Sequence, residues 1–240
     1  MLKIIICIFC VISLISCNII VDYIDFETVE ADPAIKSVNI SLELENVEVQ
    51  TKTVDLSCTY KFFTDWWAID YAYFCEQNQA VKIVDPDTRV AKVKGTHKEL
   101  KDNSDVRGFR VNGQSMAYLP KGLNKFFDNL EFLAIWTTDL MEIHSEDLAQ
   151  FTKLRILSIW ENKIEYLEKD LMKFNPNIEY IGFGKNRIQY VDSNVFDPLT
   201  RLHTLHFDGN DCYSKQVAGD RIGVLKMIDE MNEHCNSNEV

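Results

Sequence analysis

LRILSIWENKI, residues 154–164, decides the fold, because it returns 24 residues later as IEYIGFGKNRI over residues 178–188. Blocks of 24 residues begin at Val106, Leu130, Leu154, Ile178 and Leu202. Positions 1, 4, 6 and 11 of these blocks are apolar in all five copies. For a chain that is 46% hydrophobic, coincidence has a chance on the order of 10⁻⁷, so the period predicts a repeat architecture.

Position 9 of each block carries a second signature, a small polar side chain: Gln114, Thr138, Asn162, Asn186 and Asn210. An inward-pointing amide can bond backbone groups that a sharp turn leaves unpaired. The pattern resembles the leucine-rich repeat family, in its 24-residue extracellular subtype, across roughly 106–212. The resemblance implies an α/β fold: a curved solenoid with a parallel strand at positions 3 to 7 and an irregular or short-helical convex side.

A solenoid leaves both ends of its core exposed, so the resemblance also implies caps. Four of the seven cysteines lie outside the first 17 residues, and by count alone they allow three pairings. Their places at the two ends of the array imply the disulfides Cys58–Cys75 and Cys212–Cys235. We therefore expect an N-terminal cap over 58–105, five repeats over 106–211 and a C-terminal cap over 212–240.

The C-terminal cap is expected to contain a helix over 221–231 that Asp220 caps. Its predicted buried stripe consists of Ile222, Leu225, Ile228, Met227 and Met231. In the N-terminal cap, two apolar runs at 80–84 and 89–93 flank the turn sequence Asp85-Pro86-Asp87-Thr88, which predicts a hairpin. The segment VKGTH over 93–97 also resembles secreted repeat proteins of dipteran insects.

Sixteen residues separate Cys58 from Cys75, and half of them are aromatic: Tyr60, Phe62, Phe63, Trp66, Trp67, Tyr71, Tyr73 and Phe74. We interpret these rings as a plug for the first coil. A stacking platform for sugars is the alternative interpretation.

Residues 1–17 have the charged start, the apolar run and the small exit residues of a secretory signal peptide. The alternatives are an uncleaved membrane anchor and a lipoprotein signal that leaves Cys17 acylated. The following segment, 18–57, holds nine acids and two bases, and its alternation over 38–49 predicts one strand. Asn39 opens the chain's N-glycosylation sequon. We expect a secreted, extracellular protein with no membrane span in the mature chain.

The sequence shows no catalytic signature. It contains neither a Gly-rich phosphate loop nor the motifs G-x-S-x-G and H-E-x-x-H. His203 and His206 fall on a predicted strand and point to opposite faces, so no metal site is expected. The net charge of −12 disfavours nucleic-acid phosphates as a partner. We therefore expect neither an enzyme nor a cofactor.

Side chains alternate along a strand, so positions 3, 5 and 7 are predicted to face the concave surface. The candidate binding residues are Arg110, Phe132, Trp136, Ile156, Trp160, Tyr180 and His206. Trp136 and Trp160 should lie on adjacent strands, beside a notch at Gly182 and Gly184, and His206 should titrate near neutrality. The alternative is that the two indoles lie flat on one another, or that the acidic segment 18–57 covers them.

These features predict a recognition protein that binds a protein or glycoconjugate on its concave aromatic face, as in receptor-like or innate-immune proteins. The first alternative is an extracellular inhibitor or structural matrix component that acts through the acidic segment 18–57 or by dimerisation. The second is a membrane-tethered adhesin, if the leader stays attached. The sequence leaves the oligomeric state open.

Overall fold

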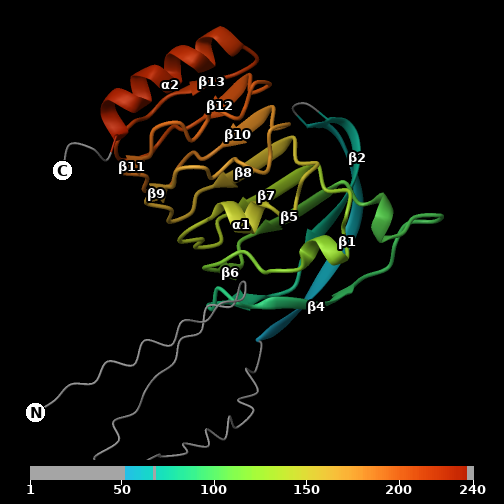
Figure 1. Cartoon of the computed structure of the whole chain (residues 1–240). Coiled ribbons are helices and arrows are strands. Elements are labelled where there is room, and N and C mark those ends of the chain that lie inside the picture. Colours follow the sequence, from blue (N-terminus) through green and yellow to red (C-terminus); the bar gives the residue numbers. More distant parts are fainter. Residues whose placement is uncertain (1–51, 67–68, 237–240) are drawn as a thin grey trace, which may run out of the picture. The chain divides into compact units, whose positions relative to one another are not determined.

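Each 24-residue block adds one short strand to a parallel sheet in the computed structural model, which describes residues 52–66 and 69–236 (Figure 1). The five strands are β5 (Gly108–Asn112), β7 (Phe132–Trp136), β8 (Ile156–Trp160), β10 (Tyr180–Gly182) and β12 (Thr204–His206). Each pairs with its neighbour in a register of 24 residues. Positions 4 and 6 are completely buried in every block. The predicted α/β leucine-rich repeat solenoid is confirmed.

The opposite side of each coil is built from short elements. They are the two-residue strands β6 (Ser115–Met116), β9 (Tyr166–Leu167) and β11 (Tyr190–Val191), the 3-10 helices η1 (Asn103–Asp105) and η2 (Leu123–Lys125), and the helix α1 (Ser145–Leu148). Positions 11 and 14 point inward here, and Leu140, Ile164 and Ile188 are fully buried. The core is therefore a column between the parallel strands and these short elements.

The predicted amide ladder bonds successive coils. Asn162, Asn186 and Asn210 are buried, and each donates from Nδ2 to a strand carbonyl of the preceding coil, at 2.8–3.0 Å. Gln114 accepts a bond from the Val81 amide at 3.1 Å. Thr138 differs, because its amide and hydroxyl both donate to Asn162 Oδ1 at 3.0 Å. Its side-chain bond therefore runs to the following coil, whereas each of the three asparagines donates to the preceding one.

The N-terminal cap extends the sheet by one coil before the first repeat. Strands β1 (Thr53–Trp66) and β2 (Ile69–Gln77) form an antiparallel hairpin that the predicted Cys58–Cys75 disulfide crosses. The last residues of β2 pair in parallel with β5. Tyr60 and Tyr73 lie in the main core, as the plug interpretation predicts for these two rings.

The predicted hairpin over 80–93 is wrong, although its turn forms: the Thr88 amide donates to the Asp85 carbonyl at 3.1 Å. Strand β3 (Lys82–Ile83) pairs with β6, whereas β4 (Arg89–Lys94) pairs with β1. Ile83 is 1% exposed because it continues the buried column of the coils, which draws the two strands apart.

The C-terminal cap consists of β13 (Gln216–Val217), antiparallel to β12, and α2 (Arg221–Cys235), which follows Asp220. The predicted Cys212–Cys235 disulfide forms. The helix buries Val224, Met227, Met231 and Cys235, while Ile222 and Leu225 are 68% and 46% exposed. The predicted stripe is therefore wrong for Ile222 and Leu225. The disulfide fixes Cys235 toward the array, and residues one or two turns before it share that face.

Several predictions from the sequence fall on residues that the structure does not describe. They are the signal peptide over 1–17, the strand over 38–49 and the glycosylation at Asn39. Within the described part of the chain, no helix is long and apolar enough to cross a membrane.

A ladder of alternating charges runs along position 2 of the coils. Arg107 donates through Nε and Nη2 to the two carboxylate oxygens of Glu131, at 2.7 Å each. Arg155 bonds Glu131 at 3.4 Å and Glu179 at 2.8 Å. The Arg107 guanidinium is the main reason that the pKa of Glu131 lies below its ordinary value of 4.5. The ladder therefore links four consecutive coils in addition to their backbone bonds.

Glu131→Gln is expected to lower the free energy of unfolding by about 1 kcal/mol at neutral pH. Because the folded pKa of Glu131 is depressed, its ionisation stabilises the fold above the ordinary pKa, and this contribution disappears as the pH falls through the folded pKa. Urea unfolding of both proteins, from neutral pH down through the folded pKa of Glu131, tests the prediction. A difference that stays constant down to acid pH would show that the ladder contributes nothing through charge.

Candidate ligand-binding site

The side chains predicted to face the concave surface do not form one open face. Phe132, Ile156 and Tyr180 at position 3 are at most 4% exposed. They form a second apolar cluster with Ala72 and Phe74 of β2, and the Phe74 and Phe132 rings meet edge to face at 4.9 Å. The expectation of an exposed row at position 3 is therefore corrected. The β1–β2 hairpin supplies side chains that pack on this side of the sheet.

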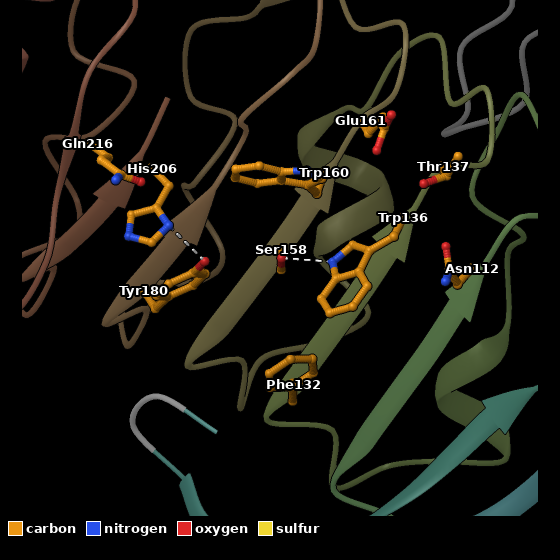
Figure 2. A pocket seen from close by; sticks show the side chains of 10 residues that line it. All are labelled: Asn112, Phe132, Trp136, Thr137, Ser158, Trp160, Glu161, Tyr180, His206 and Gln216. Atoms are coloured by element: carbon orange, nitrogen blue, oxygen red, sulfur yellow. Dashed lines mark hydrogen bonds between the residues drawn. The ribbon is translucent and has the colours of Figure 1, made fainter. Parts of the chain in front are cut away.

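Beside this cluster the same side of the sheet is hollowed into a pocket of about 570 Å³ (Figure 2). Its lining residues are Asn112, Phe132, Trp136, Thr137, Ser158, Trp160, Glu161, Tyr180, His206 and Gln216. Five of the seven predicted binding residues are among them, whereas Arg110 and Ile156 are not. The volume lies in the range of small-molecule binding sites.

Trp136 and Trp160 are paired across β7 and β8, as predicted. The Trp136 indole nitrogen donates to Ser158 Oγ at 2.9 Å, which fixes the ring toward Phe132 (Figure 2). The Arg110 guanidinium carbon lies 4.5 Å from the centroid of the same ring. Arg110 therefore lies over the face of the indole, although it does not line the pocket.

The predicted notch at the glycines is filled at Gly184. A Cβ at this position would lie 2.4 Å from the Trp160 ring, so glycine lets the indole lie directly against the backbone. Lys185 Nζ is 5.8 Å from the centroid of that ring. The absence of a side chain at Gly184 thus seats Trp160 and leaves no empty surface beside it.

Tyr180 and His206 close the other end of the pocket. The Tyr180 hydroxyl and His206 Nδ1 are 3.3 Å apart, and the two rings meet edge to face. Burial lowers the pKa of His206 below 6.5, against the opposing effect of the Asp208 carboxylate, and burial raises the pKa of Tyr180 to about 12. The imidazole is therefore neutral at pH 7, which places its titration below the neutral range that the sequence suggested.

Two polar rim residues come from a turn that recurs at position 8. Thr137 and Glu161 adopt left-handed backbone conformations, with φ of 51° and 56°, where Gly113 and Gly209 stand in other coils. Their amides donate to carbonyls of the next coil at 3.0 Å. Sequence reasoning did not assign Asn112, Thr137, Ser158, Glu161 and Gln216 to the site. Positions 5, 7 and 8 of the repeats would have indicated the first four.

The described residues contain no group of three or more His, Cys, Asp or Glu side chains placed to hold a metal ion. The chemistry of the pocket is therefore that of its aromatic rings, amides, hydroxyls and single carboxylate. These groups bind a ligand by stacking and hydrogen bonding.

Comparison with known proteins finds a likeness in the same repeats. A profile described as "Leucine rich repeat" matches residues 152–211. A search of curated proteins finds no significant match. Among solved structures, TLR13 in its complex with ssRNA13 aligns at 14% identity and a TM-score of 0.41, covering 57% of this chain and 21% of that one. The 24-residue period, the parallel sheet and the asparagine ladder give the chain a leucine-rich repeat fold, and the profile matches it over residues 152–211.

Proposed function

We propose that this chain is a secreted recognition protein without catalytic activity, which binds a protein or glycoconjugate partner in the pocket at Trp136 and Trp160. The two indoles on adjacent strands carry the proposal. Both remain partly exposed beside a cavity of about 570 Å³, while the rings at position 3 are buried. Large aromatic side chains that remain partly exposed around a concavity are typical of contact sites.

Two disulfides support an oxidising compartment, in agreement with the predicted leader over 1–17. An extracellular location also makes Asn39 a proposed glycosylation site. A receptor-like or innate-immune role, and a specific kinship with secreted proteins of dipteran insects, belong to the same proposal.

The Trp136→Ala/Trp160→Ala protein is expected to capture its partner at least about tenfold more weakly than the wild type, since central aromatic contacts contribute about 2 kcal/mol or more. The measurement is capture from the protein's native extracellular fluid, after circular dichroism and thiol assays show that both proteins are folded and oxidised.

Tyr166→Ala/Tyr190→Ala is the matched control. These tyrosines are also paired on adjacent strands, β9 and β11, and are 46% and 38% exposed, on the other side of the coils. It should capture like the wild type. Equal capture by the tryptophan variant would contradict the proposal, and would favour an inhibitor or matrix component that acts through the segment 18–57 or a homodimer.

A further inference from the structure

We infer that the pocket at Trp136 and Trp160 receives an uncharged sugar ring, so that a partner is recognised through a neutral glycan. The inference rests on the proposed function and names the class of ligand for the same site. Three properties of the pocket carry it: the division between aromatic and polar surface, the hydrogen-bonding character of the polar groups, and the charges around the indoles.

The pocket combines aromatic surface with polar groups at both ends. The two indoles and Phe132 lie in its middle, as Figure 2 shows. Asn112, with Thr137 and Glu161, stands on one side of them, and His206 with Gln216 stands on the other. A sugar ring has a matching division, because it presents C–H groups on a face and hydroxyl groups around its edge. Its C–H groups suit the negative face of an indole.

Most of the polar groups can donate and accept at the same time. Asn112 and Gln216 carry amides, and Thr137 carries a hydroxyl. His206 is neutral at pH 7 because burial lowers its pKa, so it offers one donor and one acceptor, of which Nδ1 faces Tyr180. A sugar hydroxyl also donates and accepts. An apolar peptide side chain would instead desolvate these groups without forming hydrogen bonds to them.

The charges near the indoles disfavour both cationic and anionic ligands. Arg110 lies 4.5 Å from the Trp136 ring and Lys185 lies 5.8 Å from the Trp160 ring, so a cationic guest would meet two like charges. An anionic guest would meet Glu161 in the lining. Asp208 does not line the pocket, but its carboxylate acts on the pKa of His206 and so adds a second negative charge nearby. The surroundings therefore favour an uncharged ligand that can offer a hydroxyl donor to the Glu161 carboxylate.

The test is isothermal titration of the full mature chain with methyl glycosides of glucose, galactose, mannose and N-acetylglucosamine. N-acetylneuraminic acid, methylamine and phenylalanine amide serve as anionic, cationic and aromatic comparators. We expect at least one neutral glycoside to saturate at millimolar concentration or below, and the three comparators not to bind. Saturation by none of the four glycosides, or tighter binding of a comparator, would overturn the inference.

Variants then place the binding in this pocket. Trp160→Ala should weaken the glycoside about tenfold or more. Asn112→Ala and Gln216→Ala, at exposed side chains where folding is preserved, should each weaken it about threefold to tenfold. Tyr190→Ala should leave binding unchanged. Equal binding by all of these variants would place the sugar elsewhere and refute the inference.

Failure of this inference is distinguishable from failure of the proposed function. Suppose that the captured partner still binds after enzymatic removal of its glycans, and that Trp136→Ala/Trp160→Ala does not capture it. The pocket would then bind a protein surface, and only the sugar assignment would be wrong. Loss of capture on deglycosylation, together with loss in the tryptophan variant, would support both.

Discussion

Asn186→Ala is expected to lower the free energy of unfolding by about 4 kcal/mol, because it leaves several buried backbone groups without a partner at once. The side chain is 5% exposed. Its Nδ2 donates to the carbonyls of Ile159 at 2.8 Å and Phe183 at 3.0 Å, and its Oδ1 accepts from the Ile164 amide at 3.3 Å. Alanine can bond none of these groups, although the Phe183 carbonyl keeps its bond from Asn210 Nδ2 at 3.0 Å.

Urea unfolding monitored by circular dichroism measures this loss. Asn124→Ala, at an exposed asparagine in η2, is the control and should change stability by less than about 0.5 kcal/mol. A loss below about 1 kcal/mol in Asn186→Ala would mean that water replaces the amide, and that the ladder does not hold the coils together.

The repeats could be predicted because each coil buries the same positions against the next, which leaves a periodic trace in the sequence. Position 22 is apolar in the first, second and fourth blocks, and Asn175 in the third block breaks this pattern for a structural reason. It is fully buried, and its Nδ2 donates to the carbonyls of Leu148 at 3.1 Å and Phe151 at 2.8 Å. An amide there replaces apolar packing with bonds to the preceding coil. The charge ladder was equally readable, since Arg107, Glu131, Arg155 and Glu179 alternate in sign every 24 residues.

The candidate site was predictable only in part. Alternation along a strand tells which side chains share a face, but it does not tell what else packs on that face. The burial of Phe132 and Ile156 depends on a cluster with Ala72 and Phe74, which lie about 60 to 80 residues earlier in the chain. The exposure of Ile222 likewise follows from a helix rotation that a distant disulfide sets. Such contacts have no periodic signal in the sequence.

Gly108→Ala is expected to lower the free energy of unfolding by about 2–3 kcal/mol, by forcing the Phe74 ring out of its place in the second apolar cluster. A Cβ at Gly108 would lie 2.2–2.4 Å from three atoms of the Phe74 ring. That ring is 1% exposed, and it is held between Phe63 at 4.8 Å and Phe132 at 4.9 Å, measured between ring centroids. It has no free direction in which to move, so the strain passes to the β1–β2 hairpin.

A double-mutant cycle separates this clash from a general intolerance of the strand. Phe74→Leu alone should cost about 1–2 kcal/mol, since a shorter side chain leaves a partial void. In the Phe74→Leu protein, adding Gly108→Ala should cost less than about 1 kcal/mol, because the new methyl then occupies space that the ring has vacated. Chemical unfolding of the four proteins gives the coupling energy. Additive losses would show that the Phe74 ring does not impose glycine at position 108. The packing of the hairpin on the sheet would then not depend on Gly108.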